Sequence, residues 1–280
     1  MRNSDAKKDK IENFFKKTNK IQGFIYYEDA KFFDFFLNTL NSEKIEGNIL
    51  EIGAHFGKTS ILLGEYVNSP NELHVCDVYE SKELITDSDN LVEYEESYKN
   101  RKPTRQLFEK NFYIFQNWLP VIHQFDSKNL ENVLKDHSFK FIHVDGGHTY
   151  QSVNKDMEIV MNKICKNGVI VMDDYRNYGC FGISTVFWSL LLNKKLNLIL
   201  ITEAKAYFSF GDEKFYISRL EKFLVDQKIS YTKESINQKI FIRNNSRLYR
   251  KKNLFLRILP SSLYYFLSIV KYKIIKRFYN

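Results

Sequence analysis

Residues 139–174 read FKFIHVDGGHTYQSVNKDMEIVMNKICKNGVIVMDD, and this stretch decides the fold. An apolar run over Phe139–Val144 predicts a buried strand, and the apolar spacing over Tyr150–Cys165 predicts a helix. The run Gly168–Met172 predicts a second strand, with its glycine at the C-terminal boundary of the helix. Because a strand, a helix and a strand follow one another, the stretch is typical of a βαβ unit with parallel strands.

The same alternation continues on both sides of this unit. Five more strands are predicted, over Asn48–Ile52, Glu72–Val78, Val121–Phe125, Asn197–Thr202 and Lys239–Arg243. Further helices are predicted over Phe24–Leu40, Thr59–Val67, Thr104–Phe115, Asn129–Lys135 and Ile183–Leu192. We therefore expect an α/β protein with a Rossmann-like, doubly wound, mostly parallel seven-stranded sheet and helices on both faces. In such sheets ligands bind at the carboxyl ends of the strands, so the residues that follow each strand are the candidate site residues.

The composition is that of a globular protein. The chain has 280 residues, enough for one large domain, and 44% of them are hydrophobic while 27% are charged. The three cysteines, Cys76, Cys165 and Cys180, form no CxxC pair and no zinc-binding spacing, which suits a reducing compartment. Because residues 1–17 contain no apolar stretch typical of a signal peptide, we expect a cytoplasmic protein.

The basic charge is concentrated at the C-terminal end. The net charge is +8, yet residues 246–280 hold nine basic residues and no acidic one. Residues 1–245 hold 33 basic and 34 acidic residues, and this near-neutral body argues against a nucleic-acid partner. We expect an N-terminal helical segment over 1–45, the α/β domain over 46–245 and a basic amphipathic tail over 246–280.

The loop after the strand Asn48–Ile52 has a glycine spacing that excludes two nucleotide-binding motifs. It contains no GxGxxG, and the gap from Gly53 to Gly57 is one residue too short for GxxxxGK[ST]. The pattern Glu51-x-Gly-x-x-x-Gly resembles the cofactor loop of S-adenosylmethionine-dependent methyltransferases, where glycines let the backbone approach a ligand closely. The helix that begins at Thr59 would direct its positive end towards the methionine carboxylate. A tight strand-to-helix turn without a ligand is the alternative interpretation.

The next two strands also end in polar side chains. Asp77 lies 24 residues beyond Gly53, at the end of the second strand, and an acidic side chain there can accept both ribose hydroxyls of a nucleoside. Asp126 and Ser127 end the third strand, where short polar groups can contact an adenine edge. Each residue can instead cap a helix, but their placement on three consecutive strand ends favours a nucleoside ligand.

Carboxylates follow two neighbouring strands of the predicted sheet. Asp145-Gly-Gly-His148 comes after one strand, and Asp173-Asp174 comes after the next, 28 residues beyond the first carboxylate. Because three crowded carboxylates repel one another, a hard divalent cation such as Mg²⁺ would offset their charge. The alternative is that Asp145 and Asp174 cap the helices that follow them.

The segments FIHVDGGHTYQSVNKDMEIVMNKICKNGVIVMDDY (141–175) and ILEIGAHFGKTS (49–60) resemble class I methyltransferases of the macrocin O-methyltransferase and cephalosporin-hydroxylase-like group. The resemblance covers 49–188, about half of the chain. The residues after Thr202 do not resemble this group. It implies that S-adenosylmethionine is surrounded by Glu51, Gly53, Gly57, Thr59, Asp77, Asp126 and Ser127. It implies that Mg²⁺ is held by Asp145, Asp173 and Asp174, with His148 as the catalytic base beside Asp145.

Three functions remain open at this stage. The first is a metal-dependent O-methyltransferase that acts on a hydroxyl of a sugar, a glycan precursor or another small molecule. In this reaction His148, with a reference pKa near 6.5, would accept the hydroxyl proton. The second is a metal-independent methyltransferase, and the third is a non-catalytic nucleoside-binding protein of a membrane-associated assembly. The other histidines have no such neighbours in the sequence and are expected to be structural or exposed.

Two segments lie outside the core pattern. Residues 78–103 are rich in acidic side chains and interrupt the connection between the second and third strands, either as a lid over the acceptor or as a solvated loop. In the tail, the longest uncharged run, Ile258–Val270, has 13 residues, which is too short to span a membrane. The tail is expected to lie on an anionic membrane surface or to pack on the domain or on a second copy of the chain.

Removing residues 246–280 tests the membrane interpretation. We expect the full chain to co-sediment with anionic vesicles at low salt, because each basic residue near the surface contributes about 1 kcal/mol. Binding should weaken at high salt and disappear in the truncated chain. If the full chain stays in the supernatant with anionic vesicles, the tail is a packing or oligomerisation element instead.

Overall fold

The computed structural model describes residues 2–98, 102–193 and 196–245. It divides the chain into one compact unit over Met1–Asn244 and a second unit over Asn245–Asn280. The predicted amphipathic tail therefore lies outside the described residues. No helix in the described part is both long and apolar enough to span a membrane.

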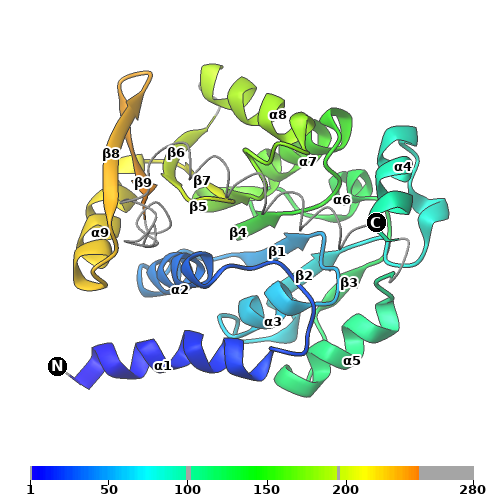
Figure 1. Cartoon of the computed structure of the whole chain (residues 1–280), viewed down its shortest axis with the longest axis horizontal. Helices are drawn as coiled ribbons and strands as arrows, with labels where there is room; N and C mark the ends of the chain where they lie inside the picture. The colour runs from blue at the N-terminus through cyan, green and yellow to red at the C-terminus, as the bar shows by residue number, and fades with distance from the viewer. Residues whose placement is uncertain (1, 99–101, 194–195, 246–280) are drawn as a thin grey trace, which may run out of the picture. The chain divides into compact units, whose positions relative to one another are not determined.

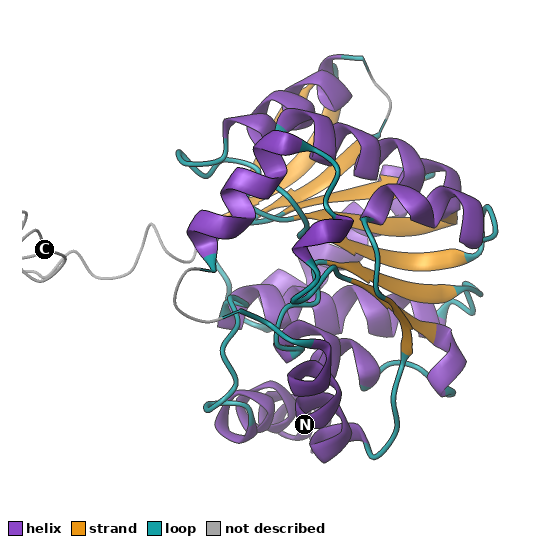
Figure 2. Ribbon diagram, turned by 90° about the vertical axis from the view of Figure 1, so that its right-hand side faces the viewer, coloured by secondary structure: helices purple, strands orange, loops and turns teal. Residues whose placement is uncertain are grey.

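The predicted α/β fold is confirmed, with a mostly parallel sheet between two layers of helices (Figures 1 and 2). The strands are β1 (Asn48–Ile52), β2 (Leu73–Cys76), β3 (Val121–His123), β4 (Phe139–Val144), β5 (Ile164–Met172), β6 (Asn197–Ile201), β7 (Ala206–Phe210), β8 (Tyr231–Ile236) and β9 (Lys239–Asn244). Their order across the sheet is β3-β2-β1-β4-β5-β7-β6-β9-β8. The strands β1 to β5 pair in parallel, whereas β7 is antiparallel to both β5 and β6, and β8 is antiparallel to β9.

The sheet has nine strands in the described residues rather than the predicted seven, because β7 and β8 were missed. Strand β7 follows β6 after a tight turn over 202–205, in which the Thr202 amide donates to the Lys205 carbonyl oxygen at 2.8 Å. Strand β8 alternates exposed and partly buried residues over most of its length. It has no continuous apolar run that would indicate a strand. Strand β5 also begins at Ile164, four residues earlier than predicted.

The helices are α1 (Arg2–Lys17), α2 (Tyr27–Ser42), α3 (Lys58–Gly64), α4 (Ser88–Ser97), α5 (Arg105–Gln116), α6 (Leu130–Val133), α7 (Tyr150–Lys163), α8 (Phe181–Leu192) and α9 (Glu213–Asp226). Short 3₁₀ turns cover Pro70–Glu72, Lys82–Leu84 and Ser127–Asn129. The sequence did not predict α9, and it placed the end of α7 two residues too late.

Alternation along the strands divides the core between the two faces of the sheet. On β4, Phe141 packs with α2, α3, α5 and α9, while Ile142 and Val144 pack with α6, α7 and α8 on the other face. The first core is rich in aromatic side chains from α2, among them Phe32, Phe33 and Phe36. The amphipathic faces of these helices are thus buried on a sheet whose parallel strands β1, β2, β4 and β5 all end at one edge (Figure 1).

Candidate active site

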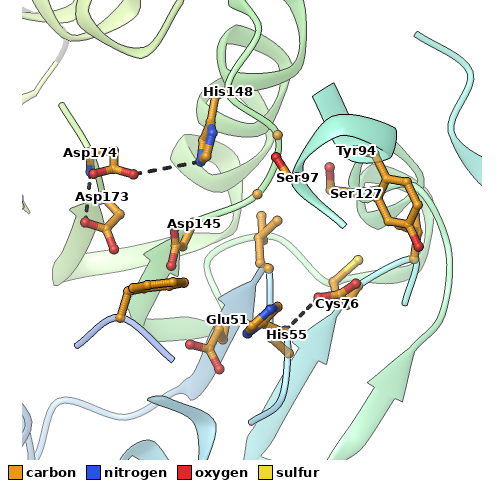
Figure 3. A pocket seen from close by; sticks show the side chains of 18 of the residues that line it. Glu51, His55, Cys76, Tyr94, Ser97, Ser127, Asp145, His148, Asp173 and Asp174 are labelled. Carbon is orange, nitrogen blue, oxygen red and sulfur yellow. Dashed lines mark hydrogen bonds and ion pairs between the residues drawn. The ribbon is translucent and has the colours of Figure 1, made fainter. Parts of the chain in front are cut away.

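A cavity of about 770 Å³ opens at the carboxyl ends of β1, β2, β4 and β5 (Figure 3). Its lining contains the predicted site residues Glu51, Gly53, Thr59, Asp77, Asp126, Ser127, Asp145, His148, Asp173 and Asp174. Gly57 is the one predicted residue that lies outside this lining. The predicted residues that follow different strands are thus brought together in one cavity at the edge where the parallel strands end.

The two glycines of the loop after β1 are required by packing inside the protein. Gly53 has φ of +87°, and a Cβ there would meet the Asp145 carbonyl oxygen at 1.8 Å. Gly57 has φ of +88° at the start of α3, and its Cβ would meet the Phe108 ring at 3.0 Å. Both φ angles are in the region that favours glycine, so the loop keeps its path by backbone conformation and close packing. Gly57 thus packs against the core at Phe108, and its role in the approach of a ligand stays a prediction.

Glu51 lies at the floor of the cavity with its carboxylate already bound by the protein. The side chain is 1% exposed, one oxygen accepts a hydrogen bond from the Ser60 hydroxyl, and the other lies 3.1 Å from His143 Nδ1. These contacts with α3 and β4 hold the loop in place. The carboxylate of Glu51 is therefore already used by the protein and is not free for a ligand in the cavity.

Asp77 is held rigidly by the backbone. Its Oδ2 accepts the His55 amide at 2.7 Å, and its Oδ1 accepts the Tyr79 amide at 2.6 Å. Each carboxylate oxygen can accept a further hydrogen bond, as binding of two ligand hydroxyls requires. His55, which the sequence assigned to a structural or exposed role, lines the cavity and stacks on Tyr98 at 5.7 Å between ring centroids.

Asp126 and Ser127 border the same cavity at the end of β3. Asp126 also caps the 3₁₀ turn that follows, because its Oδ1 accepts the Lys128 amide at 3.2 Å. Its other oxygen accepts the Thr86 hydroxyl at 3.2 Å. The residue thus combines the capping role with a place in the cavity lining.

The carboxylates after β4 and β5 do not cap the helices that follow them. The Thr149 side chain caps α7, and Cys180 is the N-cap residue of α8. The amide of Asp173 donates to the Val144 carbonyl at 3.0 Å, which places the two strand ends side by side. The capping interpretation of Asp145 and Asp174 is therefore wrong.

The three predicted metal ligands fall into two neighbouring groups rather than one. Asp145 and Asp173 have ligand atoms within 4.8 Å of each other and of His143, whereas Asp174 lies within this distance of His148 and Cys180. The carboxylate of Asp145 has no hydrogen-bond partner among the described residues. Burial and the charge of Asp173 raise its pKa to about 8.

Lys205 is the residue that the sequence analysis missed entirely. It is 1% exposed, its Nζ pairs with Asp173 Oδ2, and it lies 3.1 Å from His143 Nε2. Although burial opposes ionisation, Lys205 and His143 hold the pKa of Asp173 well below its ordinary value. The sequence analysis expected a metal ion to offset the negative charge of the three carboxylates. Lys205 offsets part of this charge from within the protein. No motif indicated this, because Lys205 lies on the turn before the unpredicted strand β7.

Helix α4, inside the segment 78–103, supplies the partner of His148. The Glu93 carboxylate pairs with His148 Nδ1 and accepts the His148 amide at 3.1 Å, while Nε2 lies 4.0 Å from Asp174 Oδ2. Burial lowers the pKa of His148, but the hydrogen bond and charge of Glu93 outweigh it and raise the pKa to about 9. Asn90, Tyr94, Ser97 and Tyr98 from the same segment also line the cavity.

Residues 50–175 match a family model described as a methyltransferase domain.

Among solved structures, the O-methyltransferase NovP has a TM-score of 0.56 and 14% identity, and the match covers 67% of this chain and 81% of NovP. The SAH-bound methyltransferase PaMTH1 of Podospora anserina has a TM-score of 0.48 and 15% identity, covering 73% of this chain and 88% of that protein. The apo TDP-rhamnose 3'-O-methyltransferase CalS11 has a TM-score of 0.43 and 14% identity, covering 73% and 94%. No protein of curated function matches the chain. The likeness to NovP shows that the two proteins share their fold.

Substitution of Lys205 by Met tests whether its ion pair supports the fold. We expect a loss of about 3–5 kcal/mol in the free energy of unfolding, because Asp173 would be left as an unpaired buried charge. Urea unfolding measures this loss, and the double variant Lys205→Met/Asp173→Asn should recover most of it.

A matched control is available on the surface. Lys82 pairs with Glu95, but both side chains are about half exposed. Lys82→Met should leave the urea midpoint unchanged, because exposed ion pairs contribute little. Equal midpoints for Lys82→Met and Lys205→Met would show that the buried pair adds no stability.

Proposed function

We propose that this chain, an S-adenosylmethionine-dependent class I methyltransferase of the O-methyltransferase group, methylates a hydroxyl of a sugar, a glycan precursor or another small molecule. The prediction of a methyltransferase is confirmed by the family match over 50–175 together with the fold. The observation that carries the proposed reaction is the single cavity that joins Asp77 to Asp145 and His148. One end of this cavity offers acceptors for nucleoside hydroxyls, and the other offers carboxylates and an imidazole for a reacting hydroxyl.

The cavity supports a defined place for the cofactor. Asp77 would accept the ribose hydroxyls, and Asp126 with Ser127 would contact the adenine. The loop from Glu51 to Thr59, which includes Gly53 and Gly57, would hold the methionine end near the start of α3. The loop conformation that Gly53 and Gly57 maintain supports this assignment, because it places the start of α3 at the cavity.

The acidic end of the cavity offers carboxylate ligands for Mg²⁺, which would be held by Asp145 and Asp173 from one group and by Asp174 from the neighbouring group. Carboxylate oxygens are its preferred ligands, and Asp145 has an oxygen pair that no described residue uses. When bound, the ion would lower the pKa of the acceptor hydroxyl and fix its position. Lys205 keeps Asp173 ionised and oriented for this purpose.

The same ion pair favours a second candidate, transfer without a metal. Lys205 already compensates one carboxylate, so the protein lowers the charge repulsion at the site with its own side chain. Alignment of the donor and the acceptor in the cavity contributes to the rate in either case. Loss of activity with a chelator separates the two candidates.

His148 would accept the proton of the acceptor hydroxyl through Nε2, because Glu93 occupies Nδ1. Its high pKa means that only about one molecule in a hundred carries neutral His148 at pH 7. Nε2 lies on the side of Asp174, within the proposed metal-binding end of the cavity. Glu93 holds the ring in this orientation, and we expect residues 78–103 to act as a lid that brings Glu93 to the site.

An acceptor screen with labelled S-adenosylmethionine tests the proposed function. We expect label transfer to a hydroxyl compound in a panel of nucleotide sugars, glycan precursors and phenols, with loss of transfer in EDTA and recovery on adding Mg²⁺. Asp77→Asn should weaken cofactor binding in calorimetry by at least tenfold, because it replaces a hydrogen-bond acceptor of the ribose. A folded Asp77→Asn protein with unchanged affinity would contradict the cofactor assignment.

The pH dependence of transfer tests His148 as the base. Its folded pKa is raised, so the neutral form increases about tenfold per pH unit and saturates above about pH 9. We expect the single-turnover rate to rise with pH in the same direction, because the neutral imidazole is the form that accepts the proton. Glu93→Gln should move the rising limb towards about pH 6.5, because it removes the carboxylate that stabilises the imidazolium.

Glu95→Gln is the control for this shift. Glu95 is on the same helix but pairs with Lys82 at the surface. Its substitution should leave the profile in place. A Glu93→Gln profile that coincides with the parent would show that the proton leaves by another route.

A further inference from the structure

We propose that His148, Asp174 and Cys180 form a binding site for a thiophilic divalent cation of the Zn²⁺ class. One ligand atom from each residue lies within 4.8 Å of the other two. This set shares only Asp174 with the three carboxylates proposed for Mg²⁺. The sequence alone did not indicate this site, because the three cysteines show no zinc-binding spacing.

The donor types select the cation. Imidazole nitrogen and thiolate sulfur are ligands of Zn²⁺, Co²⁺ and similar ions, whereas Mg²⁺ prefers oxygen. Three protein ligands with a fourth position open to the cavity is the arrangement of many zinc sites that bind water or a substrate. His148 and Asp174 both line the cavity, so this fourth position would face it.

The orientation of His148 supports the assignment independently of the cluster itself. Glu93 pairs with Nδ1, so Nε2 is the nitrogen left for an ion, and it lies 4.0 Å from Asp174 Oδ2. A histidine ligand whose other ring nitrogen is bound by a carboxylate is the usual arrangement at metal sites. Two ligands of one tetrahedral ion lie roughly 3.4–3.8 Å apart, given bond lengths of about 2.1–2.3 Å. The distance of 4.0 Å between Nε2 and Oδ2 therefore has to shorten by about 0.2–0.6 Å, and the pairs that include the Cys180 sulfur, which lie within 4.8 Å, by at most about 1.4 Å.

The packing of α8 brings the thiol into place. A Cβ on Gly182 would meet the Tyr150 amide nitrogen at 2.4 Å and the His148 carbonyl oxygen at 2.5 Å. Only glycine therefore allows the first turn of α8 to rest on the backbone that follows His148. The Cys180 amide donates to the Asn177 carbonyl at 3.0 Å, which fixes the residue before the helix. These two contacts fix the backbone that carries Cys180 beside the backbone that carries His148.

Occupation of this site has a consequence that rests on the proposed function. An ion on Nε2 of His148 uses the lone pair that would accept the hydroxyl proton. A Zn²⁺-class cation would therefore oppose the Mg²⁺-supported reaction. Binding itself requires no methyl transfer, so it is tested without substrate or cofactor.

Co²⁺ titration of the full chain, reduced and free of any histidine tag, tests the site by absorption spectroscopy. We expect a near-ultraviolet sulfur-to-cobalt charge-transfer band that Zn²⁺ abolishes and excess Mg²⁺ leaves intact. Cys180→Ser should lose this band. Cys165 is partly exposed and belongs to no metal-ligand group of the described residues, so Cys165→Ser should keep the band. Glu93→Gln should weaken Co²⁺ binding by about 10–100-fold, because the imidazole loses its orienting partner.

A second measurement uses only the parent protein and does not depend on the folding of variants. Zn²⁺ should slow iodoacetamide alkylation of Cys180, followed by peptide mass spectrometry, while Cys165 serves as the internal reference. A charge-transfer band that persists in Cys180→Ser, absence of the band in the parent, or equal alkylation of Cys180 with and without Zn²⁺ would each overturn the proposal. None of these outcomes bears on cofactor binding at Asp77, so the proposed function is judged separately.

Discussion

The buried ion pair between Lys205 and Asp173 is the interaction on which the site depends. It joins the end of β5 to the turn before β7, and His143 on β4 links it to Glu51 on β1. Four strands are thus tied by charged side chains directly below the cavity. Such a network is stable only if every member is paired, because an isolated charge in this environment is strongly unfavourable. The arrangement therefore constrains the relative positions of the strand ends that carry the site.

The network also connects the N-terminal segment to the sheet. Asp29 on α2 is buried, accepts the Tyr207 hydroxyl at 3.0 Å, and is close enough to Lys205 for the charges to interact. Around it, Phe33 packs edge-on against His143 with ring centroids 5.2 Å apart. Helix α2 therefore covers the charged network with aromatic side chains and excludes water from it. This shielding strengthens the ion pair that orders the acidic end of the cavity.

Much of the fold and of the cavity could be predicted from the sequence, because local patterns determine them. Apolar runs followed by Gly53, Asp77 or Asp145 mark the ends of parallel strands, and parallel topology brings such ends together. Lys205 and Glu93 could not be predicted in this way, because their roles arise from contacts between distant segments. Strand β7 escaped prediction for a related reason: its five residues include strand-favouring Tyr and Phe, but so short a run does not determine its type, and its place in the sheet comes from antiparallel pairing with β5 and β6. The spacing of the motifs thus indicates where ligands are expected to bind, whereas the charge balance of the site is a property of the tertiary structure.

The two groups at the acidic rim differ in how the protein compensates their charge. Asp145 and Asp173 lie beside Lys205, which supplies a permanent positive charge from within the core. Lys205 acts more weakly on Asp174, which faces His148, and the charge of His148 depends on whether it holds a proton or an ion. Glu93 favours positive charge on His148 in both cases, because the carboxylate stabilises an imidazolium and equally strengthens the ring as a metal ligand. A proton and a soft cation therefore compete for one nitrogen, and the thiol of Cys180 favours the cation without contributing to proton transfer. The rim is divided in this way into a group beside the buried Lys205 cation and a group whose charge depends on His148, and the proposed reaction would take place at the boundary between them.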